Sequence, residues 1–493
     1  MSSVSGSSAS RQNALVLRRD ILLSRVKEEL HRYVFNELPI HLIHLQSAQL
    51  CDRQTVFRRI LPVFSALTGG DLPEDLNVSL LNPVPSFTDT KKIHNFIRKR
   101  LGYAVLSDHW GEPVPAYGDI PRPALIENRP GYYDVAKFCN IAHTHNMEYA
   151  WVDSCCIDRS SDAELNQSIR SMYRWYGNSS ICIVHLADSF FVEELSQDSW
   201  FRRGWTLMQL LAPERLKFYD KTWAPLTERS NDKKSPDVLA AIQAATSISP
   251  QELQQFDPRA FDTYQVSKRM RWAANRSTPL AEDRAYSLMG VFGVVTDVAY
   301  GEGGSRAFSK LFREIVHFSN SPEVVNWVGK PAVGLSLRSL AYPPFPDAFI
   351  GSNDMVGLIR EESISLTANG LSIKLLILPA TLTAWEAPLT AVLRCFEAQV
   401  RAVCLPDFTP GDAVEGHNVE FALGGWNFST MSGHCQLSGD LIEAVLLYRI
   451  PHQRSYHMIW RRIPTQSFIR LGLKVIDLPR GKRWEDYVQI AVL

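Results

Sequence analysis

Apolar residues recur at helical spacing over the first part of the chain. Between Asn13 and Leu67 they return every third or fourth position, which is the period of one helix face. This pattern predicts two or three helices, and Gly69 and Gly70 end it. We therefore expect a helical N-terminal region with a connector over residues 13–90, preceded by a Ser-rich disordered tail at residues 1–12.

Short apolar runs alternate with helical patterns over residues 100–225. Strands are expected at Tyr103–Ser107, Tyr149–Asp153, Ser180–Leu186 and Leu216–Tyr219. Helices are expected at Tyr132–Asn146 and Ser161–Tyr176, with a short helix within Ser199–Leu211; Ser161 and Glu164 fit a capping box. Alternation of this kind implies a parallel sheet with helices on both faces, so we expect an α/β domain here.

The pattern changes twice in the rest of the chain. Residues 226–335 keep helical periodicity, with clear helices at Gln265–Asn275 and Arg306–Phe318. From about residue 343 to residue 493, alternating and β-branched stretches predict a separate β-rich domain, either a sandwich or a barrel. These stretches are Ser363–Leu366, Leu371–Leu378, Leu389–Phe396, Val400–Leu405, Leu441–Ile450 and Phe468–Ile476.

Composition narrows the class of protein. Hydrophobic residues make up 45% and charged residues 21%, as in ordinary globular proteins. Lys and Arg number 52, as do Asp and Glu, so the zero net charge argues against a dedicated nucleic-acid or anionic-membrane binder. We expect no membrane span and a cytoplasmic location. The eight Cys lack a disulfide or metal-site spacing, which favours reduced thiols and no metal.

Polar residues follow the first two expected strands. In open parallel sheets, ligands bind at the carboxyl ends of the strands, so these residues could converge on one crevice. The candidates are Ser107, Asp108, His109 and Trp110 after the first strand, and Asp153 and Asp158 after the second. The plainer alternative is that Asp153 and Asp158 cap helices or form Asx turns, and that His109 is a structural histidine.

Three blocks in order resemble those of the fungal heterokaryon incompatibility (HET) domain family. They are Tyr103–Gly111, Trp151–Asp158 with its continuation to Tyr176, and Trp200–Pro213. Glu282–Val294 and Tyr300–Gly303 resemble the segment that often follows this domain. The resemblance implies a flavodoxin-like fold similar to Toll/interleukin-receptor (TIR) domains. It also implies a role in vegetative incompatibility, non-self recognition and programmed cell death.

The resemblance also raises the question of catalysis. Some TIR-like domains cleave NAD with a Glu, and the HET pattern at that place is Trp-Thr-Leu-Gln-Glu-Leu. This chain has Gln209 at the Glu position, four residues after Trp205, and an amide can neither ionise nor act as a base. Glu164 and Asp153 are the remaining catalytic candidates beside Gln209, and Trp205 completes the expected crevice.

Two functions of different classes follow. The first is a non-catalytic signalling module that self-associates or binds protein partners, with no cofactor. The second is a TIR-like NAD glycohydrolase, for which NAD would be the substrate. A hydrolase that uses Cys155 or Ser107 as nucleophile is a third idea, but nothing in the spacing supports it.

Overall fold

The structure is a computed structural model, and its chain divides into two compact units. The α/β unit contains Met1–Phe201 and Met208–Gln255, and the C-terminal unit contains Arg202–Leu207 and Phe256–Leu493. The structure describes residues 5–68, 71–73, 76, 86–108, 114–119, 130–260, 266–319, 321–330, 342–353, 364–367, 370–386, 389–405, 419–426, 428–431, 434–437, 440–449, 460–472, 476 and 478–493.

The N-terminal region begins with a long helix and continues with a hairpin that the sequence pattern did not predict. Helix α1 (Ser5–Glu37) includes residues 5–12, which we had assigned to a disordered tail. Extending an existing helix costs far less than nucleating one, so a polar Ser-rich stretch can continue it. Strands β1 (His41–His44) and β2 (Gln49–Asp52) follow, and then helices α2 (Arg53–Ala66) and α3 (Phe87–Arg100).

The sheet of the α/β unit has six strands in the order β2-β1-β4-β3-β5-β6. The four expected strands are confirmed as β3 (Tyr103–Ser107), β4 (Tyr149–Trp151), β5 (Ile181–His185) and β6 (Leu216–Tyr219), and they pair in parallel. The β1–β2 hairpin adds to β4 in antiparallel fashion. The sheet is therefore parallel at its centre, and its antiparallel edge comes from a region in which we expected only helices.

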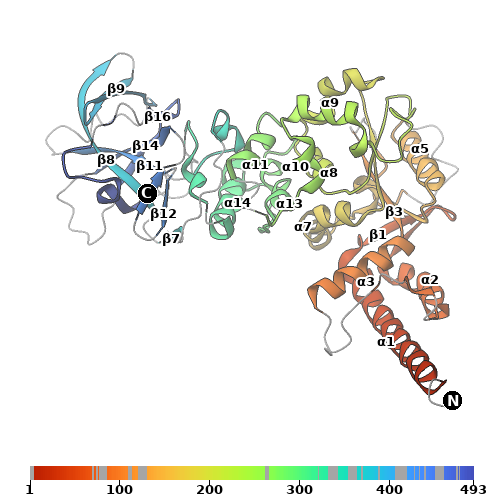
Figure 1. Cartoon of the computed structure of the whole chain (residues 1–493). Helices are drawn as coiled ribbons and strands as arrows, with labels where there is room; N and C mark the ends of the chain where they lie inside the picture. The colour runs from red at the N-terminus through yellow and green to blue at the C-terminus, as the bar shows by residue number, and fades with distance from the viewer. Residues whose placement is uncertain are drawn as a thin grey trace. The chain divides into compact units, whose positions relative to one another are not determined.

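Successive parallel strands are added first on one side of β3 and then on the other. In chain order they run 2-1-3-4, because β4 lies on one side of β3 and β5 lies on the other. Helix α5 (Pro130–Thr144) joins β3 to β4, and helix α7 (Asp162–Asn178) joins β4 to β5. Right-handed connections in opposite directions place these helices on opposite faces, as Figure 1 shows. The order reverses between β3 and β5, and such a switch point opens a ligand crevice at the carboxyl edge.

Helix α7 is held to β3 by two buried tyrosines. The hydroxyl of Tyr176 on the helix donates to the carbonyl of Leu106 at 2.7 Å, and the hydroxyl of Tyr103 on the strand donates to the carbonyl of Trp175. The Trp151 ring of β4 packs edge-on against Trp175 and Tyr176. These contacts fix the strand end from which the polar residues continue.

The α/β unit ends with helices α8 (Thr206–Leu211), α9 (Pro236–Thr246) and α10 (Pro250–Gln255). The buried ammonium of Lys233 donates to the carbonyl of Pro213 at 2.6 Å, just after α8. Burial lowers the pKa of Lys233 to about 8, because the interior disfavours the charged form. This lysine therefore hydrogen-bonds the chain at the end of α8 and is not part of the carboxyl edge of the sheet.

The C-terminal unit begins with helices, as the sequence predicted. Helices α11 (Val266–Ala273) and α14 (Gly304–Ser319) confirm the two expected helices, with the short α12 (Asp283–Tyr286) and α13 (Met289–Phe292) between them. The fully buried guanidinium of Arg269 donates to the carbonyls of Pro258 at 2.6 Å and Val291 at 2.9 Å.

A nine-stranded sheet fills the rest of this unit and confirms the expected β-rich region. It runs β10-β9-β8-β11-β14-β15, with β7 and β17 also on β8 and β16 on β14; β12 and β13 form a separate hairpin. The strands are β7 (Ser365–Thr367), β8 (Gly370–Glu386), β9 (Thr390–Cys395), β10 (Ala398–Val403), β11 (Glu420–Gly425), β12 (Phe428–Met431), β13 (His434–Leu437), β14 (Leu441–Arg449), β15 (Arg461–Ile463), β16 (Ile469–Gly472) and β17 (Val488–Val492). Every pairing is antiparallel.

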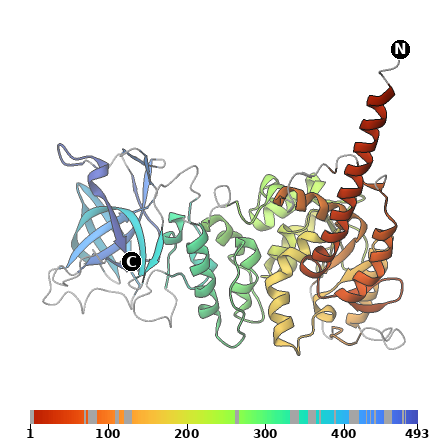
Figure 2. The same cartoon turned by 90° about the horizontal axis from the view of Figure 1, so that it is seen from below.

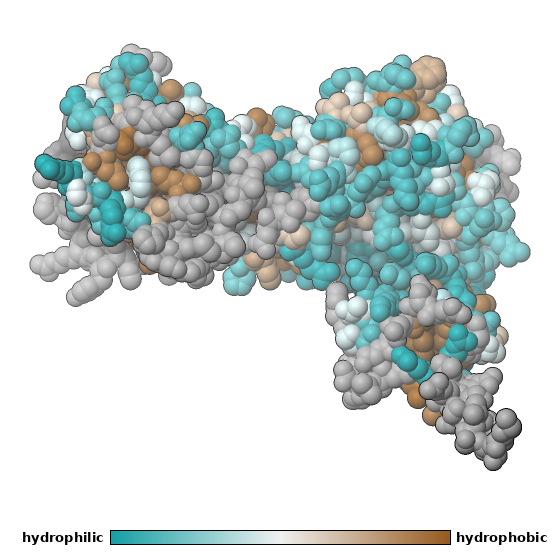
Figure 3. Space-filling view, viewed as in Figure 1, coloured by the Kyte–Doolittle hydropathy of each residue, from teal (hydrophilic) through white to brown (hydrophobic). Residues whose placement is uncertain are grey.

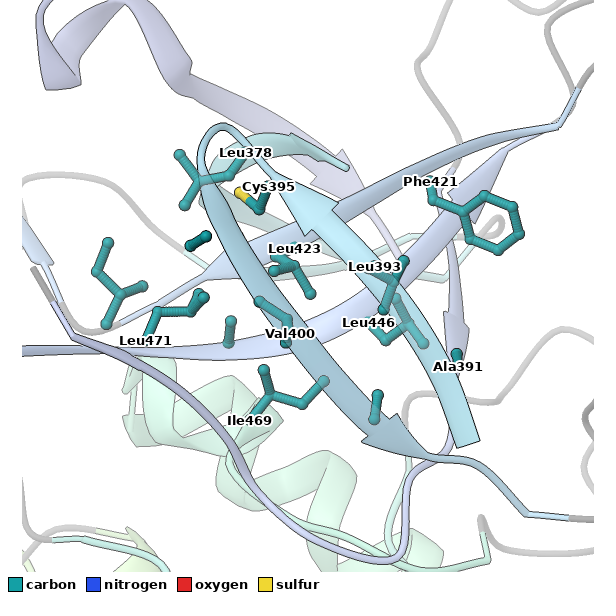
Figure 4. Close-up of a cluster of buried hydrophobic side chains, with 14 of the residues drawn as sticks. Leu378, Ala391, Leu393, Cys395, Val400, Phe421, Leu423, Leu446, Ile469 and Leu471 are labelled. Atoms are coloured by element: carbon teal, nitrogen blue, oxygen red, sulfur yellow. The ribbon is translucent and has the colours of Figure 1, made fainter. Parts of the chain in front are cut away.

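The nine-stranded sheet curls around one apolar core. Figure 2 shows the strands curving about a common centre, and Figure 4 shows the side chains that fill it, among them Leu378, Leu393, Leu423 and Leu446. An antiparallel bridge between Cys404 and Thr465 links the end of β10 to the segment between β15 and β16. The sheet thus begins to close in the manner of a barrel.

One face of the α/β unit can be followed by its hydropathy. On the face shown in Figure 3, hydrophilic residues cover most of the described surface of the α/β unit, and hydrophobic residues gather in patches. None of the described helices is long and apolar enough to cross a membrane.

Gly204 stands where a side chain would collide. Its N–H donates to the carbonyl of Ser277 at 2.9 Å, and a Cβ there would lie 2.5 Å from Cγ2 of Thr278. The hydroxyl of Thr278 donates to the carbonyl of Leu280 at 2.6 Å, which holds that methyl in place. We expect Gly204→Val to destabilise the C-terminal unit by about 1–3 kcal/mol in a denaturant melt.

A matched control for this substitution is Gly177→Ala near the end of α7. A Cβ there would meet its nearest atom, the carbonyl oxygen of Ala212, at an ordinary 3.6 Å. Because alanine favours a helix over glycine, this variant should be neutral or slightly stabilised. Equal stabilities of Gly204→Val and wild type would contradict the clash.

Candidate functional site

The candidate site lies at the carboxyl edge of the sheet, at the switch point between β3 and β5. Asp108 directly follows β3, and His185 is the last residue of β5. Asp134 comes from the first part of α5, and Trp223 from the turn after β6. Four segments that are far apart in the sequence thus place polar or aromatic side chains at one edge.

Asp108 and His185 form a buried pair. Nδ1 of His185 lies 3.0 Å from Oδ1 of Asp108, and the two residues are only 9% and 7% exposed. Burial lowers the pKa of His185, but the hydrogen bond and charge of Asp108 and the charge of Asp134 outweigh it. The pKa of His185 is therefore raised above its usual value, which favours the imidazolium beside two carboxylates.

Trp223 contacts both His185 and Asp134. Its ring stacks on the His185 ring, with centroids 4.0 Å apart and an interplanar angle of 8°. Its Nε1–H donates to Oδ1 of Asp134 at 2.9 Å. The indole therefore orients the imidazole by packing and the second carboxylate by a hydrogen bond.

The turn after β6 presents Trp223 in an unusual backbone conformation. Its φ is 67°, in the left-handed region that bulky residues rarely adopt and that costs about 1–3 kcal/mol. The Asp220 carboxylate organises the turn: Oδ1 accepts from the N–H of Thr222 at 2.8 Å, its hydroxyl at 2.7 Å and the N–H of Ala224 at 2.9 Å. These hydrogen bonds hold the strained backbone in place, and this backbone conformation directs the indole toward the sheet edge.

Ser107 belongs to a second, fully buried group. Its hydroxyl donates to Oε1 of Gln209 at 2.6 Å and accepts from Nε1–H of Trp200 at 2.8 Å. All three residues are buried. Gln209, which stands where the resemblance implies a Glu, is therefore a neutral acceptor that is already engaged by Ser107.

Asp158 and Glu164 have structural roles: Asp158 forms a turn, and Glu164 accepts a hydrogen bond from the backbone of Asp158. Oδ1 of Asp158 accepts from the N–H and the hydroxyl of Ser160 at 2.9 and 2.6 Å, as in an Asx turn. Oε1 of Glu164 accepts from the N–H of Asp158 at 2.9 Å and lies 3.1 Å from Nδ1 of His41 in β1. Half of the expected capping box is present, because the N–H of Glu164 donates to Ser161 at 3.3 Å.

The other expected site residues are distributed differently. Asp153 is partly buried in the first turn of the short helix α6 (Asp153–Cys156), and its charge, together with burial, raises the pKa of Tyr176. Trp205 is partly exposed and belongs to the C-terminal unit. His109 and Trp110 lie outside the described residues. Of the expected set, Ser107 and Asp108 stand at the edge, with Gln209 bonded to Ser107.

Sequence reasoning missed Asp134 and Trp223 and did not choose His185, although it noted that a strand ends there. The strand-end position of His185 was the available signal. Asp134 falls within the helix expected at Tyr132–Asn146, and Trp223 lies beyond the strand expected at Leu216–Tyr219, so neither follows an expected strand end directly. Only the strand order and the turn after β6 bring these two to the site.

Two kinds of chemistry can be assessed from the geometry. Within the described residues, one ligand atom from each of Asp108, Asp134 and His185 lies within 4.8 Å of the others, a group that could hold a metal ion. The thiol of Cys155 is fully buried, and its hydrogen bond with Cys156 and its burial raise its pKa well above the usual value. A thiol in this state is a poor nucleophile, which counts against the cysteine hydrolase idea.

Comparison with known proteins identifies the domain that carries this edge. Residues 103–194 match the family model described as heterokaryon incompatibility protein (HET). The chain therefore carries a HET domain, as the three sequence blocks indicated, and that domain includes Asp108, Asp134 and His185. Gln209 and Trp223 follow the matched residues.

A relative supports the same assignment over a longer stretch. Over 227 residues the chain is 33% identical to the vegetative incompatibility protein HET-E-1 of Podospora anserina. The aligned region covers 43% of this chain but only 16% of that relative. No solved structure matches the chain.

Ser107→Ala tests the buried group. The change removes one partner from each of Gln209 and Trp200, and loss of a partner from a buried polar group costs roughly 1–3 kcal/mol. We expect a loss of about that size in chemical denaturation. Ser160→Ala, at an exposed hydroxyl, should change stability by less than about 0.5 kcal/mol. Indistinguishable midpoints for the two variants would refute the role of Ser107.

Glu164→Ala tests whether this carboxylate anchors the hairpin rather than catalyses. Without Oε1, the N–H of Asp158 and the ring of His41 lose their partner, so the amides of β1 and β2 should exchange hydrogen faster. Glu164→Gln keeps an oxygen that can accept from Asp158 and should retain most of the protection. Unchanged exchange in Glu164→Ala would show that Glu164 does not anchor the hairpin.

Proposed function

We propose that this chain acts in heterokaryon incompatibility, as a cytoplasmic factor of non-self recognition that signals programmed cell death. Its α/β unit does so by binding protein partners or further copies of itself, without catalysis. The HET domain at residues 103–194 supports the role, as does the relative named for vegetative incompatibility. Because the alignment covers a small share of that relative, the role of the whole chain is a proposal.

The hydrogen bonding of Gln209 is the observation that carries the non-catalytic mechanism. A Glu at this position could hold a negative charge toward a developing cation, whereas the amide is neutral. Its oxygen already accepts from the buried hydroxyl of Ser107 at 2.6 Å. The other two carboxylate candidates do not replace it, because Glu164 is engaged with Asp158 and His41 and Asp153 lies in the first turn of α6.

Two adjacent phenylalanines offer a surface for partner binding. Phe190 and Phe191 follow β5 by a few residues and are 40% and 64% exposed. The ammonium of Lys221 lies over the Phe190 ring, 3.8 Å from its centroid. Aromatic side chains are enriched at protein interfaces, so this exposed pair is the proposed contact.

Expression in a fungal host that lacks the gene tests the proposal. Wild type should reduce viability when the incompatibility response is triggered, and a Phe190→Ser/Phe191→Ser double variant should lose at least most of that effect while folding normally. Val63→Ser, at an apolar residue of α2 that is also exposed, should behave as wild type. A full death response from the folded double variant would contradict partner binding through these residues.

The second candidate function is NAD cleavage, because the switch-point edge carries two carboxylates and a stacked indole. We expect purified wild type and Gln209→Glu to leave NAD unconsumed, since no ionised group replaces the family Glu in wild type. Consumption by wild type that Asp108→Asn abolishes would overturn the non-catalytic proposal. Consumption by Gln209→Glu alone would show an intact pocket whose chemistry this chain has lost.

A further inference from the structure

We propose that Asp108, Asp134 and His185 form a binding site for a divalent transition-metal ion at the switch point of the α/β unit. Such an ion could bind at the carboxyl edge of the sheet whether or not the chain acts in incompatibility. Its binding is independent of whether the chain cleaves NAD, since the three residues and their contacts are the whole of its basis.

The positions of the ligand atoms suit one small ion. An oxygen of each carboxylate and a nitrogen of His185 all lie within 4.8 Å of one another. Metal–oxygen and metal–nitrogen bonds to such ions are about 2.0–2.2 Å long, so ligands around one ion stand about 3–4 Å apart. The side chains would need to shift by little to surround an ion, and the ion would replace the hydrogen bond between Asp108 and His185.

The charges of the group favour a cation. Two carboxylates lie close together at a largely buried edge, and like charges in that arrangement are costly unless a positive charge compensates them. A divalent ion bound to neutral His185 would leave the group with no net charge. A protonated His185, 3.0 Å from Asp108, supplies one positive charge against two carboxylates.

The ligand types select the class of metal. Carboxylates alone would suit Mg²⁺ or Ca²⁺, but an imidazole nitrogen favours transition metals such as Zn²⁺, and Mn²⁺ accepts both. Three protein ligands leave room for water or a substrate atom on the ion, as in catalytic rather than structural metal sites. The geometry therefore points to an open site.

The surroundings hold the ligands as metal sites require. Ligands of a bound metal are oriented by hydrogen bonds and packing from neighbouring residues. Trp223 does both, since it donates to Asp134 and stacks on His185, and the Asp220 turn holds it in a strained conformation for this purpose.

Metal titration of the full chain tests the proposal. Chelator-treated protein is titrated with Mn²⁺, followed by its electron paramagnetic resonance signal, and with Zn²⁺ by calorimetry. Mn²⁺ is the primary probe because it binds thiolates poorly, so the eight Cys contribute little. Wild type should bind one ion, and Asp108→Asn and Asp134→Asn should each weaken its binding by roughly 10–100-fold or more.

Controls separate loss of the site from loss of the fold. Asp158→Asn, at a carboxylate in an Asx turn elsewhere, should bind the ion as wild type does. Asp134→Asn changes a partly buried residue and should melt at the wild-type temperature in the absence of metal, so its weakened binding would support the site even if Asp108→Asn unfolds. If wild type binds no stoichiometric ion, or if both variants bind it as tightly as wild type, the proposal is wrong.

Discussion

The reversal of strand order between β3 and β5 is the constraint on which the site depends. The connection after β3 turns toward β4, and the next connection must pass back over β3 to reach β5. Because right-handed connections in opposite directions use opposite faces, the carboxyl edge between the two strands is left open. Asp108 and His185 occupy the two sides of this edge, so their 3.0 Å contact is a direct result of the topology.

Two groups at this edge differ in chemical character. Ser107, Gln209 and Trp200 are joined by neutral hydrogen bonds, which stabilise the end of β3. The neighbouring residue Asp108 belongs instead to a charged group, with a second carboxylate, an imidazole and a stacked indole. The edge of this HET domain thus places a neutral hydrogen-bonded group directly beside a charged one.

The parts that could be predicted from sequence are those with strong local patterns. The four parallel strands and the helices α7, α11 and α14 follow buried apolar runs or clear helical periodicity, and the structure confirms them. The β1–β2 hairpin was missed because its strands are only four residues long and lie among helical patterns. In the C-terminal sheet, β11, β15 and β17 were missed. Strands β11 and β17 pair with β8, which is distant from them in the sequence, and β15 is only three residues long.

The sequence by itself determined the alternation of strands and helices, the family blocks and the residues that end each strand, because these depend on local spacing and side-chain type. It also shows Gln209 at the position where the family resemblance implies a Glu. Only the tertiary structure decided which strand ends are neighbours, and therefore that Asp108 meets His185 whereas Glu164 meets His41. Strand order arises from contacts between distant segments, which leave no periodic signal in the chain. The left-handed conformation of Trp223 is held locally by Asp220, but only the strand order brings that turn to His185.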